Sequence, residues 1–122
     1  MRMLIVDDSN MIRSRISRVV QGGGLSGIAL VGLARNGAEA LRVARATQPE
    51  VVTMDLTMPE MDGIECVEHV IKIKPDVLIL VVSALADKAT AVEAIEKGAN
   101  GFLCKPFTDD QLNEALAELI GE

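Results

Sequence analysis

Several apolar runs of this sequence end in polar or charged residues that could take part in chemistry. Asp7 and Asp8 follow the run MLIV, Asp55 follows VVTM, Ser83 ends VLILVVS, and Lys105 follows GFLC. Runs without alternating polar residues are typical of parallel strands that are covered on both faces. Parallel strands end at the same edge of a sheet, where open α/β folds bind their ligands. We therefore expect these side chains to converge at one edge.

The three acids predict a divalent cation at this edge. Two carboxylates about 4 Å apart repel by about 4 kcal/mol at an effective dielectric of 20, so a cluster of Asp7, Asp8 and Asp55 needs a positive ion. A few oxygen ligands completed by water suit Mg²⁺ better than Ca²⁺, and no 12-residue calcium-binding loop is present. A cation, the Lys105 ammonium and the Ser83 hydroxyl around a carboxylate would suit the transfer of a phosphoryl group.

Strand and helix patterns alternate along the chain. Strands are predicted at residues 3–7, 28–33, 51–54, 77–83 and 101–104. A helix is predicted after each strand, with apolar positions within residues 12–20, 41–44, 64–71, 92–95 and 112–120. This alternation predicts one α/β domain over residues 1–122, a doubly wound five-stranded parallel sheet with five helices on its two faces.

Local signals mark the ends of the predicted helices. Asn36, Asp87 and Thr108 are candidate N-caps, and Thr108 with Gln111 forms a capping box. The glycines at 22–24 should end the first helix by supplying a left-handed residue. The later helices are expected to end near Pro49, Pro75 and Gly98. In the last helix we expect a buried stripe of Leu112, Leu116, Leu119 and Ile120.

Composition and charge exclude several classes of protein. No apolar run approaches the roughly 18 residues of a membrane span, and MRMLIV lacks the pattern of a secretory signal, so we expect a cytoplasmic protein that contacts no membrane. The net charge of −6 argues against nucleic-acid binding. Residues 1–48 carry seven Arg and three acids (+4), whereas residues 49–122 carry five Lys and fifteen acids (−10), which we interpret as solvated helix faces. Cys66 and Cys104 are predicted to be small buried hydrophobes.

The sequence resembles the receiver domains of two-component response regulators, and among them the stand-alone chemotaxis regulators of the CheY type. The resemblance rests on four segments in order: LIVDD at 4–8, MDLTMPEMDG at 54–63, VVSA at 81–84 and KPF at 105–107. It covers the whole chain and implies a flavodoxin-like sheet with strand order 2-1-3-4-5.

The function implied by the resemblance is a phosphorylation-activated switch in a phosphorelay. Asp55 would accept a phosphoryl group from a histidine kinase. The family pattern makes Asp8, Asp55 and the backbone carbonyl of Thr57 the Mg²⁺ ligands, with Asp7 bound through water. Lys105 would pair with the phosphoryl oxygens.

The resemblance also implies residues that transmit the signal and set its duration. Ser83 matches the switch hydroxyl, and Phe102 matches an aromatic residue whose rotamer reports phosphorylation, although core filling explains Phe102 equally well. The corresponding Lys-Pro bond in the family is typically cis. Lys105-Pro106 can adopt this form because the trans form of a bond before proline is favoured by only about 1 kcal/mol. Relatives that dephosphorylate quickly tend to carry amide or acidic side chains where this chain has Thr57 and Leu85, so we expect slow autodephosphorylation.

Partners and alternatives follow from the same resemblance. As partners we expect a histidine kinase that donates the phosphoryl group, an output protein such as a flagellar motor switch component, and a phosphatase. The chain itself is expected to be a signalling domain and not a classical enzyme. The alternatives are a receiver excised from a larger protein, such as a chemotaxis methylesterase, and a non-phosphorylated adaptor, although the adaptor would have lost an acid or the lysine. An aspartyl-phosphate phosphatase would need an acid in place of Thr57. A flavin-binding module would need a phosphate-binding loop where Asp7 and Asp8 stand.

Overall fold

The computed structural model describes residues 1–22, 25, 27–58, 60–84 and 88–121. Within these residues the strands are β1 (Arg2–Val6), β2 (Ala29–Ala34), β3 (Val51–Met54), β4 (Leu78–Ser83) and β5 (Gly101–Cys104). The helices are α1 (Asn10–Gln21), α2 (Gly37–Thr47), α3 (Gly63–Ile73), α4 (Lys88–Glu96) and α5 (Asp109–Ile120). The strands pair in parallel in the order β2-β1-β3-β4-β5, which confirms the predicted class and strand order.

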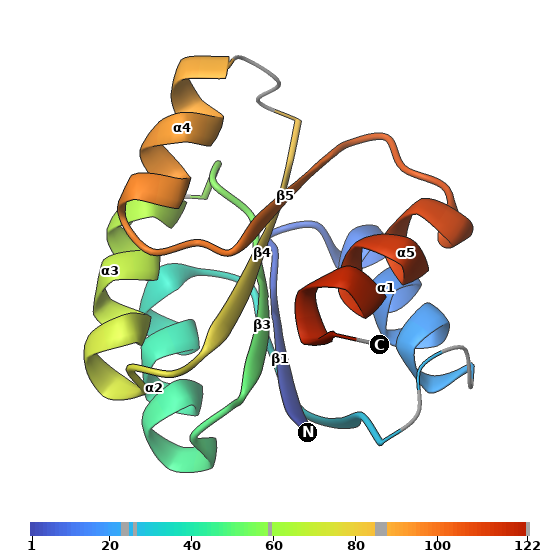
Figure 1. Cartoon of the computed structure of the whole chain (residues 1–122). Coiled ribbons are helices and arrows are strands. Elements are labelled where there is room, and N and C mark those ends of the chain that lie inside the picture. Colours follow the sequence, from blue (N-terminus) through green and yellow to red (C-terminus); the bar gives the residue numbers. More distant parts are fainter. Residues whose placement is uncertain (23–24, 26, 59, 85–87, 122) are drawn as a thin grey trace.

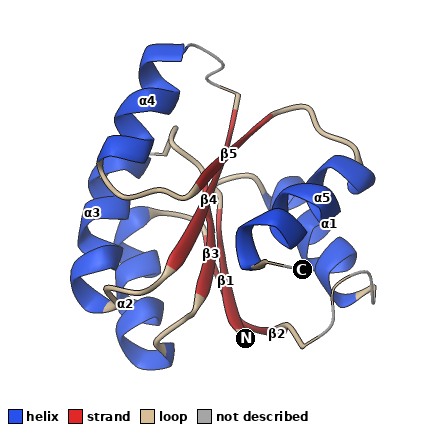
Figure 2. Ribbon diagram, in the orientation of Figure 1, coloured by secondary structure: helices blue, strands red, loops and turns tan. Residues whose placement is uncertain are grey.

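Helices cover the sheet on both faces. Figure 1 shows α2, α3 and α4 on one face and α1 with α5 on the other, and Figure 2 shows the strands enclosed between them. Successive strand residues point to opposite faces, so Leu4 and Val6 join the core under α2 and α3 while Met3 and Ile5 join the core under α1 and α5. All four side chains are buried, which explains why this strand reads as an uninterrupted apolar run.

The predicted helix starts follow local side-chain chemistry. The Asn36 side chain accepts a hydrogen bond from the Glu39 N–H at 2.8 Å, and Thr108 and Gln111 form the expected capping box. Both caps satisfy backbone N–H groups that a first helical turn leaves without partners. Asp87, the third predicted N-cap, lies outside the described residues. Among the described residues, every helix is too short or too polar to cross a lipid bilayer.

One expectation about an individual residue is wrong, and another is tested only in part. Gly22 ends α1 as predicted with a right-handed φ of −76°, because its N–H bonds to the Val19 carbonyl and tightens the last turn, while Gly23 and Gly24 lie outside the described residues. A left-handed residue instead closes α2, at Gln48 with φ 49°. Cys66 is buried as expected, whereas Cys104 is exposed because it is the last residue of the edge strand β5.

The apolar positions of the last two helices are only partly covered. In α5, Leu112 and Leu116 are fully buried, while Leu119 and Ile120 near its end are half-buried. The predicted stripe is therefore confirmed in its first two residues. In α4, Val92 and Ile95 each keep 47% of their surface exposed, and the buried contact with the sheet is made by Ala94.

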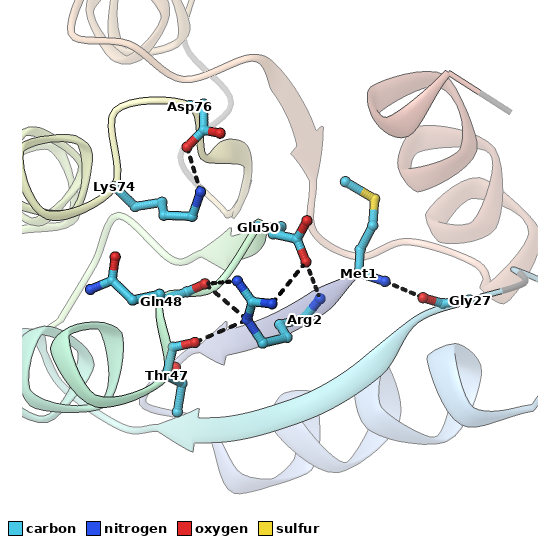
Figure 3. Close-up of polar contacts among 8 residues, drawn as sticks. All are labelled: Met1, Arg2, Gly27, Thr47, Gln48, Glu50, Lys74 and Asp76. Carbon is cyan, nitrogen blue, oxygen red and sulfur yellow. Dashed lines mark hydrogen bonds and ion pairs between the residues drawn. The ribbon is translucent and has the colours of Figure 1, made fainter.

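The amino-terminal ends of the strands are held by Arg2. Its guanidinium donates to the carbonyls of Thr47 and Gln48, the end of α2, and pairs with the Glu50 carboxylate at 3.5 Å (Figure 3). A cation placed against the last carbonyls of a helix is favourable because these carry the negative end of the helix dipole. The Arg2 N–H bonds to the same carboxylate, and this bond is the main reason that the pKa of Glu50 is lowered. This end of the sheet is thus fixed by structural contacts, opposite the edge with the clustered acids.

Candidate functional site

The predicted site residues stand at or just beyond the carboxyl ends of four strands. Asp7 follows β1, Asp55 follows β3, Ser83 is the last residue of β4, and Lys105 follows β5. The sheet's hydrogen bonding continues past the strand ends: the Asp55 N–H donates to Val6 at 3.0 Å, and the Lys105 N–H donates to Ser83 at 2.9 Å. The backbone at these positions is therefore fixed by the sheet.

Three carboxylates meet at this edge. One oxygen from each of Asp7, Asp8 and Asp55 lies within 4.8 Å of the other two. Asp7 and Asp55 are almost fully buried, at 1% and 3% exposure, while Asp8 is exposed and leaves the cluster open to solvent on one side. Backbone N–H groups hold the two buried acids: that of Ser9 donates to Asp7 Oδ1 at 2.9 Å, and that of Thr57 donates to Asp55 Oδ1 at 3.3 Å.

The Lys105 ammonium lies beside the two buried acids. Its Nζ is 2.7 Å from Asp7 Oδ2 and 3.7 Å from Asp55 Oδ1. Fully ionised, the three carboxylates and one ammonium sum to −3 + 1 = −2, so Lys105 neutralises only part of the cluster. The contact with Asp7 was not anticipated, because the sequence predicted a partner for Lys105 only in a phosphoryl group.

Burial and the neighbouring charges of the cluster raise the pKa of Asp55. Its pKa rises from 3.8 to about 6, first because burial removes water from the charged form and then because Asp7 repels it. Lys105 and the Thr57 N–H act in the opposite direction but do not cancel these effects. A carboxyl group with this pKa is mostly ionised at pH 7, which keeps it available as a ligand or a nucleophile.

The helix that follows Asp55 begins very close to it. Gly63 is the first residue of α3, and a β-carbon there would lie 2.2 Å from the Asp55 carbonyl oxygen and 2.5 Å from the Leu56 α-carbon. Both are backbone atoms that cannot rotate away, so only glycine permits this approach. The sequence alone does not indicate this contact, because it depends on how closely α3 approaches the end of β3.

The remaining predicted site residues lie around the cluster. Ser83 is fully buried at the end of β4, and Phe102 is half-buried on β5, where it contacts the core beneath α3 and helps line an open groove of about 480 Å³. The Lys105-Pro106 bond is cis, as expected. Thr57 lies next to the cluster through its N–H, and Leu85 falls outside the described residues.

The donor set fits a hard divalent cation. All three side chains offer carboxylate oxygens, which Mg²⁺ prefers, and the exposed side of the cluster leaves room for the waters that Mg²⁺ retains. The raised pKa of Asp55 reflects repulsion that a cation would relieve. The residues present are thus consistent with a magnesium site.

Comparison with known proteins identifies the family. A sequence model of the response regulator receiver domain matches residues 3–117. The chemotaxis protein CheY of Thermotoga maritima is 40% identical over 115 residues, which are 94% of this chain and 93% of that protein. A protein-glutamate methylesterase/protein-glutamine glutaminase of Halobacterium salinarum is 42% identical over 104 residues, 84% of this chain but 29% of that protein.

A solved structure agrees with this result. The Borrelia burgdorferi CheX–CheY–BeF₃–Mg²⁺ complex matches with a TM-score of 0.91 and 25% identity, covering 98% of this chain and 89% of the matched chain. The fold, the acid cluster and the sequence relationships agree with one another. The chain therefore belongs to the response regulator receiver domains of two-component signalling, and chemotaxis proteins of the CheY type are among the relatives that it matches over nearly their whole length.

Proposed function

We propose that this receiver domain accepts a phosphoryl group on Asp55 and uses Mg²⁺ to do so. Asp8, Asp55 and the Thr57 carbonyl would hold the cation directly, and Asp7 would hold it through water. The observation that carries the proposal is the meeting of three carboxylates within 4.8 Å beside the Lys105 ammonium. The Borrelia burgdorferi complex of CheX and CheY, which contains BeF₃ and Mg²⁺, supports the same cation here.

Asp55 is the nucleophile in the proposed reaction. One of its carboxylate oxygens forms a bond to the phosphorus of a phosphohistidine on the kinase, while the phosphorus–nitrogen bond breaks and the imidazole leaves with the electron pair and takes up a proton. When it is bound, the cation would neutralise part of the negative charge on the phosphoryl oxygens. Lys105, 3.7 Å from Asp55 Oδ1, needs only a small movement to add a second positive charge there.

The phosphoryl group would then change the affinity for an output partner. Ser83, buried at the end of β4, is the proposed group that senses the phosphoryl oxygens, and Phe102, half-buried on the neighbouring β5, is the proposed reporter. β4 and β5 pair directly, with Val81 opposite Phe102, so a shift at the end of β4 can reach this residue. The output partner is proposed to be a protein of the chemotaxis system, such as a flagellar motor switch component.

A second candidate is the receiver of a larger regulator. The Halobacterium salinarum methylesterase supports it, because the present chain matches only 29% of that protein. In both cases residues 1–122 would act as one receiver domain with the same phosphoryl chemistry. The reading frame of the gene beyond residue 122 and the identity of the neighbouring signalling genes would distinguish the two candidates.

Intact mass spectrometry after incubation with acetyl phosphate tests the phosphoryl chemistry. We expect one added phosphoryl mass in the presence of Mg²⁺, little without the metal, and none in Asp55→Asn. Asp110→Asn, which changes an exposed acid on α5, serves as the matched control and should behave as wild type. Full modification of Asp55→Asn, or an equal rate in EDTA, would overturn the proposal.

A further inference from the structure

Arg13 contacts the peptide group that joins two of the clustered acids. Its Nη1 donates to the Asp7 backbone carbonyl at 2.6 Å, and its Nη2 donates to Asn10 Oδ1 at 3.2 Å. The side chain is half-buried and folds back from the first turn of α1 toward the end of β1. Because the Asp7 carbonyl belongs to the Asp7–Asp8 peptide bond, this contact fixes the plane of the peptide from which Asp8 extends.

The other backbone contacts of this segment hold Asp7, while the Asp8 carboxyl group interacts with that of Asp55. The Asp7 N–H donates to the Ala34 carbonyl in β2, and the Asp7 carboxylate accepts from the Ser9 N–H and from Lys105. Asp8 lies beyond the last residue of β1, on the exposed side of the cluster. Its direction therefore depends on the orientation of the peptide that precedes it, and Arg13 sets that orientation.

We propose that Arg13 is a positioning residue for the cation site. Through the Asp7 carbonyl it holds Asp8 in the direction that metal binding requires, without contacting the metal or the phosphoryl group. This inference rests on the proposed function, because it assumes that the acid cluster binds Mg²⁺. Contacts that orient metal ligands from outside the coordination shell typically contribute about 10-fold to 100-fold in metal affinity.

The charge of Arg13 acts in the opposite direction, so the sign of the effect is decisive. A guanidinium beside a cation site repels the cation, and its removal by charge alone would tighten Mg²⁺ binding. Its removal as a positioning group would weaken Mg²⁺ binding. If Arg13 only joins α1 to β1, its removal would lower the free energy of unfolding and leave the Mg²⁺ affinity of the folded protein unchanged.

The test is an Mg²⁺ titration of the whole chain without phosphoryl donor, followed by the amide NMR signals of the acid cluster. Arg13→Met, which keeps length and helix propensity, is expected to raise the Kd for Mg²⁺ about tenfold. Arg18→Met removes the same charge from an exposed position on the same helix and is expected to change the Kd less than twofold. An unchanged or lower Kd in Arg13→Met would overturn the proposal.

Arg13→Lys keeps the charge but replaces the two guanidinium nitrogens that donate to Asp7 and Asn10 with one ammonium nitrogen on a shorter side chain. We expect an intermediate Kd, about threefold above wild type, so this variant decides the matter even where Arg13→Met folds poorly. A Kd equal to or below that of wild type would show that the paired guanidinium donors are not needed and would contradict positioning. Thermal unfolding of each variant ensures that the titrations are made on folded protein.

The Mg²⁺ dependence of acetyl phosphate labelling supplies a second readout. Arg13→Met is expected to need about tenfold more Mg²⁺ for half-maximal rate and to reach the wild-type rate at saturation, because Arg13 does not contact the phosphoryl group. A lower maximal rate with unchanged Mg²⁺ dependence would contradict the assignment. If wild type takes up no phosphoryl group, the proposed function fails, while the titration still decides the role of Arg13.

Discussion

Asp55 is almost completely covered by protein, yet the proposed reaction needs it ionised. Its pKa of about 6 lies above the value of 3.8 that it has when exposed, so the folded state binds the proton more tightly than the unfolded chain does. The stabilisation from this group is therefore full below pH 4 and is lost as the pH rises through about 6. By linkage the loss amounts to up to about 3 kcal/mol. Ionised Asp55 therefore lowers the free energy of unfolding of the metal-free protein.

We predict that Asp55→Asn stabilises the metal-free protein. The amide can still accept the Thr57 N–H but carries no charge, so the free energy of unfolding in EDTA at pH 8 should rise by about 1–3 kcal/mol. The gain should shrink at pH 5, where Asp55 is largely protonated in the folded protein. Urea unfolding at both pH values measures it.

The matched control for this prediction is Glu114→Gln on the exposed side of α5, which should show no such pH dependence. Saturating Mg²⁺ should stabilise wild type more than Asp55→Asn, because the variant has lost one ligand charge. Equal or lower stability of Asp55→Asn in EDTA at pH 8 would refute the explanation.

A second prediction at this scale concerns how long the phosphoryl group lasts. Hydrolysis needs a water held in line with the bond that breaks, and neither the short Thr57 nor the apolar Leu85 can orient it. We expect wild type to lose radiolabel from Asp55 at least tenfold more slowly than the double variant Thr57→Asn/Leu85→Glu. Decay is followed in excess Mg²⁺ for wild type, both single variants and the double variant, and equal decay in all four would exclude side-chain control at these positions.

The site residues differ in how far the sequence could predict them. Asp7, Asp55 and Lys105 were placed together because each follows an apolar run and strand ends share one edge of a parallel sheet. The Arg13 contact could not be predicted, because it depends on how one side chain folds back over the first turn of α1. Exposure of Cys104 was missed for a similar reason, since the sequence alone does not state which edge positions a helix covers.

At the scale of elements, Gly63 couples the start of α3 to the acceptor. Its α-carbon faces the backbone of Asp55 and Leu56, so the position of the helix and the position of the carboxylate depend on each other. Gly37 is also the first residue of its helix, α2, but a β-carbon there would meet the Met61 side chain, with Sδ at 2.7 Å and Cβ at 2.8 Å. The Met61 thioether is flexible and can rotate away, whereas its β-carbon moves only with its backbone.

These two glycines give a matched prediction. Gly63→Ala should lower the free energy of unfolding by about 2–3 kcal/mol, because backbone atoms must shift to admit the methyl group. Gly37→Ala should lower it by only about 1 kcal/mol, because most of the Met61 side chain can repack and alanine favours the helix, so that only the Met61 β-carbon requires a small shift. Chemical denaturation measures both, and acetyl phosphate labelling should slow only in Gly63→Ala. Equal destabilisation by the two substitutions would contradict this account.

Element boundaries were predictable where the signal is local. The caps at Asn36 and Thr108 were identified because a side chain bonds to a backbone group three residues away. The left-handed conformation of Gln48 was missed, because the conformation that closes a helix depends on where the chain must go next. The register shift between β1 and β2, beside Leu4, likewise has no signal in the sequence.

At the scale of the whole molecule, the proposed switch must connect the acid cluster to a surface about Phe102. We predict that Ser83→Ala keeps the Mg²⁺ affinity within about threefold, while Lys105→Ala tightens Mg²⁺ binding because it removes a positive charge from beside Asp7 and Asp55. Both variants should lose the response at this surface, because both residues would contact the phosphoryl group. Amide NMR shifts of β5 and α5 with and without BeF₃ measure the response. Wild-type shifts in both variants would show that the signal takes another route.

The strand order β2-β1-β3-β4-β5 also separates the two halves of the chain in space. Residues 1–48 build β1, β2, α1 and α2 on one side, with a net charge of +4, and residues 49–122 build the other side, with −10. The domain therefore has a permanent electric dipole that is directed along the sheet. The boundary between its positive and negative halves lies between β1 and β3, where the acid cluster is located. A charged partner would rotate the molecule before touching it, an effect that fades as salt shortens the Debye length. Dielectric relaxation at low ionic strength would measure this moment directly.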